Sequence, residues 1–445
     1  MTLPRLCLPL AVLAFGAAAA PAGAAPVPLL NAPNAQEVAL AGNDVIVART
    51  AARGGVLVDA VPSEGDAARR LLTIAPGRRG ATSAVLVAAS SQRVAVLAGF
   101  GRGGGIERRL YTGPPAGPLR LDIQAGPSGF FPVDAAVDGD RVLVVEEQRV
   151  GGTRARLLIP GSAPRTVPWP GDILPPVSLS GTRAAFVGTD QRMTEQLDLK
   201  LFVVDLATGA PQVAMPTEAP VELALAPDGH VVAESGHGLF TVAPGRPAQR
   251  LAGSRSMLRP RLAGTAVAAL ERTRLGAVRP AVLDPGSTIA RPLGIQTFDA
   301  RDIAADDRNV AWIAHGCVLV APLGAAAPSA PPAGPCPRSE ATVDSFENTL
   351  HGRIVRLRAT CVAAPAGGCR GSLVLRRHGV VGRARFHVAP DRQRTVKVRV
   401  QERIARLLRK RERHGGHVIL HSTTRVADGG PPARGGVVFL DEVKT

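Results

Sequence analysis

Aromatic residues are scarce in this chain: Phe, Trp and Tyr together make up 3% of the 445 residues. This scarcity argues against a sugar-binding platform of stacked rings and against single-stranded nucleic-acid binding by base stacking. Long amphipathic helical patterns are almost absent, and only five cysteines occur. By contrast, 49 Gly and 39 Pro can supply many tight turns. The composition therefore favours an all-β protein, and the length suggests two or three domains.

The N-terminal residues 1–24 are typical of a secretory signal peptide. Arg5 supplies a positive charge, Leu6 to Ala20 form an apolar run, and Ala22-Gly23-Ala24 offer a cleavage site of small residues. The run of about 15 residues is shorter than the roughly 20 that span a bilayer, so we expect cleavage rather than anchoring. No later stretch is apolar enough to span a membrane. We therefore expect a secreted, periplasmic or cell-envelope protein.

Four cysteines remain once Cys7 leaves with the signal: Cys317, Cys336, Cys361 and Cys369. An even number in an exported chain indicates disulfides. Of the three possible connectivities we favour the two sequence-local pairs, Cys317–Cys336 and Cys361–Cys369. A four-thiolate zinc site is the alternative, but the C-x-x-C pairs that such sites usually show do not occur.

A hairpin pattern recurs seven times between about residues 37 and 323. Each copy has a short apolar strand, a turn of Gly, Asp, Asn or Ser, and a second apolar strand, as in EVALAGNDVIVA from Glu37 and DAAVDGDRVLVVEE from Asp134. The turns lie near residues 42, 91, 139, 181, 228, 264 and 307, spacings of about 36 to 49 that match the blades of a β-propeller. One or two further strands follow each hairpin. Seven four-stranded sheets around an axis can bury faces that one sheet alone leaves exposed.

The seventh copy lacks a fourth strand before the Ala/Pro-rich linker at residues 324–335. The segment VPLLNAP, from Val27, lies unused before the first copy. We predict that this segment supplies the missing strand and closes a propeller formed by residues 25–323. Cys317–Cys336 would then tie the last blade to the linker.

Two segments carry a resemblance to a known family. Ala226 to Ala233 (APDGHVVA) resembles the S-P-D-G-x-x-I-A hairpin of TolB-like, WD-repeat-like bacterial propellers. Leu201 to Gly209 (LFVVDLATG) resembles the strand and turn that follow it. The resemblance implies a propeller fold, and it implies binding to other envelope proteins.

The texture changes in residues 336–445, which contain about six short strand candidates that mostly alternate apolar and polar residues. This pattern favours an immunoglobulin-like β-sandwich, and it resembles small sandwich modules of secreted bacterial proteins in which a short cysteine pair staples an early strand to its neighbour. Cys361 and Cys369 fit that role. ERIARLLRKRER, from Glu402, is the one convincing helix, with Ile404, Leu407 and Leu408 on its apolar face.

Positive charge is concentrated in the same region. Residues 336–445 hold 22 Lys and Arg against 9 Asp and Glu, a net charge of +13 out of +17 for the whole chain. A net positive charge of this size creates an electrostatic field that attracts polyanions. The alternative is that these charges only face water in an Arg-rich chain. The basic cluster on the expected helix could equally be the solvent-exposed side of that helix. The cluster consists of Arg403, Arg406, Arg409, Lys410, Arg411 and Arg413.

Motifs for cofactors and metals find no support. Gly99 to Gly104 matches the dinucleotide fingerprint, but IERRLYTG follows as a strand where a helix is needed. His417 and His421 would lie about 13 Å apart on a strand, too far to share one ion with His414. The acids of Asp138-Gly139-Asp140, Asp228-Gly229 and Asp306-Asp307 suit turn geometry. We expect no cofactor and no metal site.

Catalytic motifs are equally weak. No G-x-S-x-G elbow is present. Carboxylates that could reach a propeller mouth are Glu146, Glu147, Asp190, Glu195 and Asp198, and none is assigned a catalytic role because the sequence cannot place them at defined separations.

We therefore expect a non-enzymatic binding or scaffold protein whose propeller holds a protein or peptide partner, and we expect a monomer without nucleic-acid partners. One alternative is a propeller enzyme, a lyase or hydrolase, with carboxylates in the central channel. Another is binding of an anionic envelope polymer or surface through the basic C-terminal region. Fold alone does not decide among these classes.

Overall fold

The fold is described from a computed structural model of the chain. The described residues are 26–65, 67–76, 82–100, 107–124, 129–149, 151–190, 199–216, 222–314, 316–325, 340–362, 367–427 and 433–444. The predicted signal peptide, Glu195, Asp198, Cys336 and residues 326–335 of the predicted linker lie outside them.

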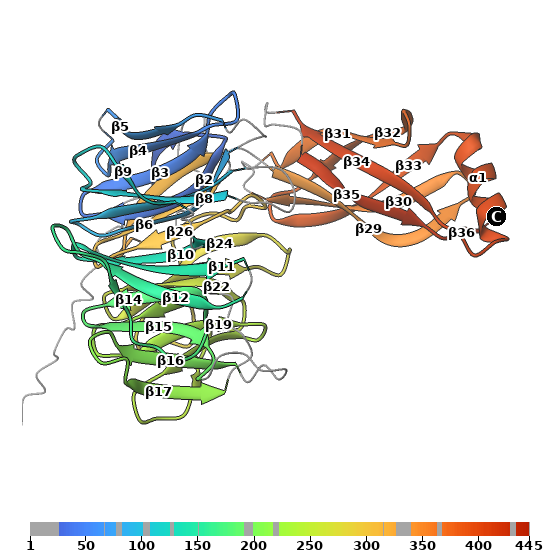
Figure 1. Cartoon of the computed structure of the whole chain (residues 1–445). Coiled ribbons are helices and arrows are strands. Elements are labelled where there is room, and N and C mark those ends of the chain that lie inside the picture. The colour runs from blue at the N-terminus through green and yellow to red at the C-terminus, as the bar shows by residue number, and fades with distance from the viewer. Residues whose placement is uncertain are drawn as a thin grey trace, which may run out of the picture.

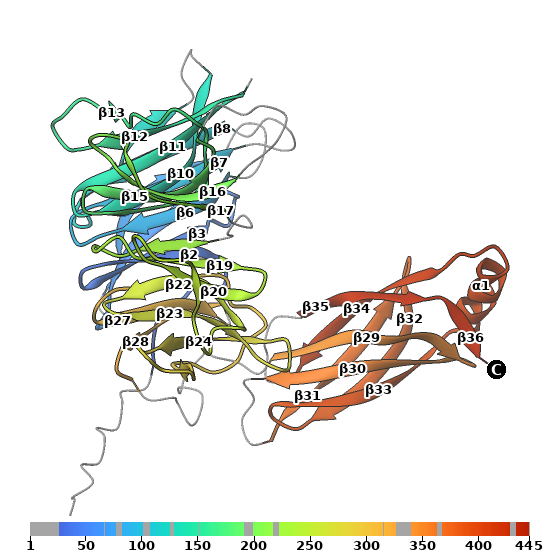
Figure 2. The ribbon, with the colours of Figure 1, turned by 90° about the horizontal axis from the view of Figure 1, so that it is seen from below.

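Residues 26–325 form a seven-bladed β-propeller, each blade an antiparallel sheet of four strands (Figure 1 and Figure 2). From the channel outward, the first blade consists of β2 (Ala35–Ala41), β3 (Asp44–Thr50), β4 (Val56–Pro62) and β5 (Arg69–Ile74), and the second of β6 (Thr82–Ala89), β7 (Val94–Phe100), β8 (Glu107–Gly113) and β9 (Arg120–Gln124). The third consists of β10 (Phe130–Asp138), β11 (Arg141–Gln148), β12 (Thr153–Leu158) and β13 (Arg165–Thr166), and the fourth of β14 (Ile173–Ser180), β15 (Arg183–Gly188), β16 (Lys200–Asp205) and β17 (Pro211–Pro216). The last three are β18 (Leu223–Leu225), β19 (Val231–Ser235), β20 (Gly238–Val242) and β21 (Gln249–Arg250); β22 (Met257–Ala263), β23 (Ala266–Arg272), β24 (Val278–Leu283) and β25 (Arg291–Pro292); and β26 (Ile303–Ala305), β27 (Asn309–Ala314), β28 (Cys317–Pro322) and β1 (Val27–Asn31). The predicted seven blades and the all-β class are confirmed.

The ring is closed by the N-terminal strand. β1 pairs antiparallel with β28, with Val27 opposite Val320 and Asn31 opposite Cys317. The prediction that the segment from Val27 completes the seventh blade is therefore correct. Closure of this kind covers the edge that β28 would otherwise present to solvent.

Packing between neighbouring sheets explains why the strand sequences are nearly continuous in apolar residues. In β7 every residue from Val94 to Gly99 is buried, because both faces of the sheet meet a neighbouring blade. Side chains of alternating direction enter separate clusters: Val94 and Val96 pack toward the first blade, and Ala95 and Leu97 toward the third. A strand buried on both faces does not alternate polar and apolar residues.

The C-terminal residues form one eight-stranded sheet in the order β35-β34-β31-β32-β33-β30-β29-β36. Its strands are β29 (Glu340–His351), β30 (Ile354–Val362), β31 (Cys369–Arg376), β32 (Val380–Val388), β33 (Arg392–Val400), β34 (Val418–Val426), β35 (Ala433–Leu440) and β36 (Glu442–Lys444). The sheet curls until β29 contacts β35, although five other strands separate them in the hydrogen-bonded order. The C-terminal strands thus form a nearly closed β unit with a buried interior. Its classification as an immunoglobulin-like sandwich stays a prediction.

The one helix of this unit is α1 (Glu402–Glu412), at the predicted position. Ile404, Ala405 and Leu408 are buried against the sheet, whereas Leu407 is only partly buried. Cys361 and Cys369 form the expected disulfide. Cys317 is also disulfide-bonded, and its predicted partner Cys336 lies outside the described residues.

The C-terminal unit projects from the propeller with α1 at its distant end (Figure 1 and Figure 2). Its attachment includes the Glu340 carboxylate, which accepts hydrogen bonds from the Thr297 hydroxyl at 2.9 Å and from the Phe298 backbone N–H at 2.6 Å. Among the described residues, no helix is long and apolar enough to cross a membrane.

Candidate functional site

The central channel of the propeller is lined by the innermost strand of every blade and encloses about 620 Å³. Along most of its length the wall consists of Ala, Val and Leu side chains, such as Ala39, Val87 and Ala136. Charged residues gather where the innermost strands begin, and they include Glu37, Asp134, Glu222, Arg259, Arg261 and Asp302. The channel therefore has an apolar wall along most of its length and one charged mouth.

Carboxylates at this mouth come from four different blades. Glu37 lies on β2 in the first blade and Asp134 on β10 in the third. Glu222 directly precedes β18 in the fifth blade, and Asp302 directly precedes β26 in the seventh. The propeller thus brings together acids that are up to 265 residues apart in the sequence.

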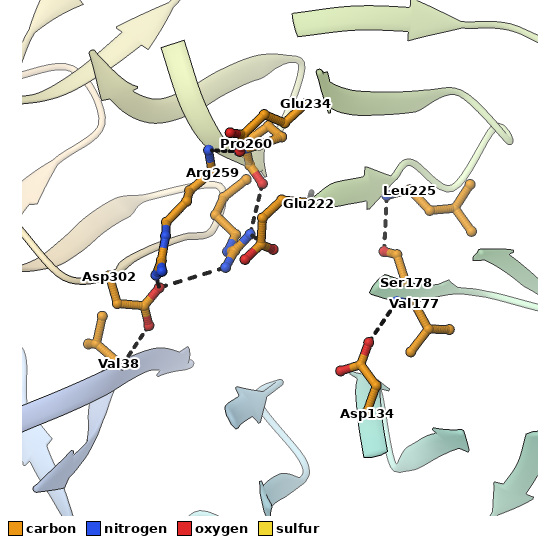
Figure 3. A network of polar contacts seen from close by, with 11 residues as sticks. Val38, Asp134, Val177, Ser178, Glu222, Leu225, Glu234, Arg259, Pro260 and Asp302 are labelled. Carbon is orange, nitrogen blue, oxygen red and sulfur yellow. Dashed lines mark hydrogen bonds and ion pairs between the residues drawn. The ribbon is translucent and has the colours of Figure 1, made fainter. Parts of the chain in front are cut away.

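Asp302 is the most strongly held of these acids, because its side chain is only 3% exposed and both of its oxygens have partners. Its Oδ2 accepts a hydrogen bond from the backbone N–H of Val38 at 2.9 Å, and its Oδ1 accepts one from Nη1 of Arg259 at 3.2 Å (Figure 3). Nη2 of Arg261 lies 3.7 Å from the same Oδ1. Asp302 therefore joins the sixth, seventh and first blades.

Arg261 connects this carboxylate to a second one. Its Nη1 donates a hydrogen bond to Oε2 of Glu222 at 3.1 Å, and the Glu222 side chain remains 28% exposed. Burial alone would lower the pKa of Arg261, but the carboxylates of Glu222 and Asp302 raise it above its ordinary value. The guanidinium therefore stays charged, and water can reach the Glu222 side chain that it binds.

Asp134 is held by backbone groups. Its Oδ2 accepts a hydrogen bond from the N–H of Val177 in the fourth blade, and its Oδ1 accepts one from Ala135, both at 2.9 Å (Figure 3). Similar contacts join later blades, since Ser178 Oγ accepts from the N–H of Leu225 and Glu234 Oε2 accepts from the N–H of Arg259. Side-chain oxygens at the mouth thus satisfy backbone donors of the next blade.

Two mouth carboxyls have strongly shifted pKa values. Burial, and then the charge and hydrogen bond of Asp302, raise the pKa of Glu37 from 4.5 to about 9, although Arg259 and Arg261 oppose the shift. Burial raises the pKa of Asp134 from 3.8 to about 7, against the hydrogen bonds from Val177 and Ala135. At neutral pH Glu37 is therefore a protonated acid, and Asp134 is divided between its two forms.

This arrangement places a proton donor and proton acceptors around one water-accessible cavity. Carboxyl groups whose environments push their pKa values apart are the usual pattern of general acid and base catalysis. The same groups also hold neighbouring blades together. Within the described residues, no group of three or more His, Cys, Asp or Glu side chains is arranged to hold a metal ion.

The carboxylates singled out from the sequence lie elsewhere. Glu146 is buried on β11, where Arg154 and Arg156 bind it at 2.8 Å and 2.6 Å, and Glu147 beside it is exposed. Asp190 is exposed and pairs with Lys200 at 2.8 Å. None of these three lines the channel.

The other singled-out residues fall on turns and on the surface. Phe100 ends β7, and the strand β8 follows where a dinucleotide site would need a helix. The acids at Asp138 and Asp228 lie at the turns between first and second strands. The basic cluster of residues 403–413 is exposed on α1 and just after it, far from the channel (Figure 1).

A signal for the mouth residues does exist in the sequence. Glu37, Asp134, Arg259 and Asp302 each stand five residues before the turn residue of their hairpin, namely Gly42, Gly139, Gly264 and Asp307. Aligning the seven copies on their turns would have shown charged residues recurring at one position of an otherwise apolar strand. Because innermost strands start at the same end of a propeller, that position marks one mouth of the channel.

Comparisons with known proteins agree with the fold. No protein-family model matches the sequence, and no curated protein matches it significantly. Among solved structures, a puromycin-hydrolyzing peptidase of Mycobacterium tuberculosis is 16% identical with a TM-score of 0.44, and the match covers 66% of this chain and 52% of that one. A structure from a study of two prolyl endopeptidases is 14% identical with a TM-score of 0.46, covering 74% and 54%. TolB from Acinetobacter baumannii is 11% identical with a TM-score of 0.37, covering 62% of each chain.

These similarities concern the propeller fold, and the chain spans about half the length of the two peptidases. The expectation of a non-enzymatic scaffold is nevertheless corrected, because the similar solved structures are a puromycin-hydrolyzing peptidase, a puromycin hydrolase and a prolyl endopeptidase. The expectation had rested on the lack of a recognisable catalytic motif. The carboxylates at the channel mouth form no local motif, because they are dispersed over the chain and assemble only when the ring closes.

Proposed function

We propose that the protein is a hydrolase that uses carboxyl groups at the channel mouth as general acid and general base. The observation that carries the proposal is the presence at one mouth of Glu37, with its pKa raised to about 9, and Asp134, with its pKa raised to about 7. Glu37 would donate a proton to the leaving group, and Asp134 would take a proton from the attacking water. Asp302 would act as a positioning residue through its hydrogen bond to Glu37.

The balance of protons is complete in this scheme. Water loses a proton to the Asp134 carboxylate as its oxygen bonds to the electrophilic centre of the substrate, and the leaving group receives the proton of Glu37 as its bond breaks. Proton exchange with solvent then restores both groups. Glu222, which remains 28% exposed, supports the proposal because its charge contributes to the raised pKa of Asp134.

The pH profile tests these roles. Activity requires ionised Asp134 and protonated Glu37, so kcat should rise through about pH 7 and fall through about pH 9. The mature protein should be screened against peptide and aryl-glycoside libraries at pH 8, with products identified by mass spectrometry. We expect Glu37→Gln to lower kcat by about two to four orders of magnitude and to remove the alkaline limb.

Glu147→Gln is the matched control, because Glu147 is exposed on the same blade as Asp134 but lies outside the channel. It should retain the wild-type rate. Hydrolysis that survives in both Glu37→Gln and Asp134→Asn would refute the proposed roles, and so would the absence of any hydrolysed product across the libraries.

We also propose that the protein acts outside the cytoplasm. The N-terminal pattern of charge, apolar run and small residues supports export, and the disulfide between Cys361 and Cys369 suits an oxidising compartment. N-terminal sequencing of the protein recovered from its own culture tests this, and a retained Met1 would contradict it.

A further inference from the structure

The distant end of the C-terminal unit carries an unusual concentration of exposed positive charge. Arg403, Arg406, Arg409, Lys410, Arg411 and Arg413 are all exposed on α1 and the residue after it. Only Glu402 and Glu412 offset them within the helix. Ile404, Ala405 and Leu408 face the opposite way into the core, so the charges share the outward side of α1.

Large apolar side chains are exposed directly beside this helix. Ile419 on β34 is 38% exposed, and Phe439, which lies opposite it on β35, is 43% exposed. Val437 on β35 is 42% exposed and lies opposite His421. These residues alternate with buried neighbours such as Val418 and Leu440, so their outward direction follows from strand geometry.

The charged and apolar parts form one continuous surface. Nη1 of Arg411 donates a hydrogen bond to the backbone oxygen of His417 at 3.0 Å, and the His417 ring meets the Phe439 ring edge-on with centroids 5.7 Å apart. Phe439 is in turn the cross-strand neighbour of Ile419. The name distal surface is used below for Arg406, Lys410, Arg411, Arg413, His417, Ile419 and Phe439.

We propose that the distal surface docks the protein on an anionic phospholipid bilayer. Lys and Arg side chains gain binding energy near negatively charged headgroups, and exposed Phe and Ile side chains gain it by entering the boundary of the acyl chains. A nucleic acid or an anionic polymer would use the charges and leave the apolar residues in water. α1 lies at the end of the unit furthest from the propeller, so such docking would place the propeller away from the bilayer surface (Figure 2).

The test uses the full mature protein and sedimentation with vesicles of phosphatidylcholine alone or with 30% phosphatidylglycerol. We expect at least tenfold stronger partitioning onto the anionic vesicles at about 0.1 M salt. The triple variant Arg406→Gln, Lys410→Gln, Arg413→Gln should lose roughly a hundredfold, since each basic residue near an anionic surface contributes about fivefold. These three side chains make no hydrogen bond or ion pair with other described residues, so their replacement should not disturb folding.

A second variant separates a bilayer from a soluble polyanion. Ile419→Ser with Phe439→Ser should weaken binding to anionic vesicles at least tenfold and leave binding to polyphosphate and duplex DNA unchanged. The matched control is Arg246→Gln with Arg250→Gln, which removes exposed charge from the propeller and should leave vesicle binding nearly unchanged. Equal binding to both vesicle types would overturn the proposal, and vesicle binding that is insensitive to the apolar variant would replace it with a polyanion site. Neither outcome bears on hydrolysis at the channel.

Discussion

The carboxylate of Asp302 accepts a hydrogen bond at 2.9 Å from the backbone N–H of Val38, a residue 264 positions earlier in the chain. Asp302 directly precedes the innermost strand of the last blade and Val38 lies on that of the first, so this contact closes the ring on its channel side. On the outer side the pairing of β1 with β28 closes it. The channel mouth, and with it the proposed site, depends on both closures.

Asp302→Ala should destabilise the propeller by about 2–3 kcal/mol, because it leaves a buried backbone donor and two half-buried guanidinium groups without their acceptor. Arg259, Arg261 and the N–H of Val38 would all lose a partner. Urea unfolding followed by tryptophan fluorescence measures the change. Asp299→Ala is the control, since that ion pair with Arg301 is 42% exposed on the Asp side and should matter by less than about 1 kcal/mol. Equal effects of the two substitutions would contradict the closing role of Asp302.

The stability of the propeller should decrease between about pH 4 and pH 9. Glu37 and Asp134 bind protons more tightly in the folded than in the unfolded chain, with folded pKa values of about 9 and about 7. Their stabilising contribution is therefore complete below their ordinary pKa values and is lost as the pH rises through the folded ones. Glu37→Gln, which imitates the neutral acid, should lose less stability than wild type between pH 6 and pH 9. Unfolding free energies that fall in parallel for both proteins would rule out the raised pKa of Glu37.

The disulfide between Cys361 and Cys369 should stabilise the C-terminal unit. It closes a loop with a sequence separation of eight residues, for which loop-closure entropy gives about 2.5 kcal/mol. Both half-cystines are fully buried, so Cys361→Ala with Cys369→Ala avoids placing a hydroxyl in the core. Calorimetry of the double variant should show a lower Tm for the C-terminal transition and an unchanged propeller transition. A loss confined to the propeller would contradict the placement of the bond.

Two turn glycines provide a matched test of strain against steric conflict. Gly181 and Gly209 both have positive φ, at 56° and 70°. A Cβ at Gly181 would meet nothing within 4 Å, whereas one at Gly209 would lie 1.9 Å from the backbone oxygen of Pro168. Gly181→Ala should therefore cost about 1 kcal/mol, from the backbone conformation alone. Gly209→Ala should cost at least about 2 kcal/mol more, because the backbone must move as well. Similar losses of unfolding free energy would show that the 168–209 contact is absent.

Sequence patterns predicted strands and the helix correctly where the signal lies within the element itself. The hairpin turns at Gly42, Gly139 and Gly181 mark the first two strands of their blades, and the helix over Glu402–Glu412 lies where its apolar spacing predicts. The sequence indicates about six strands in the C-terminal region, whereas the sheet has eight among the described residues; β36, with three residues, is too short to show an alternating pattern. The curl that brings β29 to β35 also has no local signature, because it depends on the twist accumulated over the whole sheet.

The proposed site likewise combines features that the local sequence predicts with features that arise only in the folded ring. The sequence by itself determined that seven similar sheets would pack around an axis, since continuous apolar strands cannot shield both faces alone, and that the segment from Val27 was free to complete the last of them. Only the tertiary structure decided that Glu37, Asp134, Glu222 and Asp302 meet at one mouth and that two of them hold their protons unusually tightly. The physical reason is that a pKa depends on burial and on neighbouring charges, and both arise here from blades that are distant in the chain and adjacent only in the closed ring.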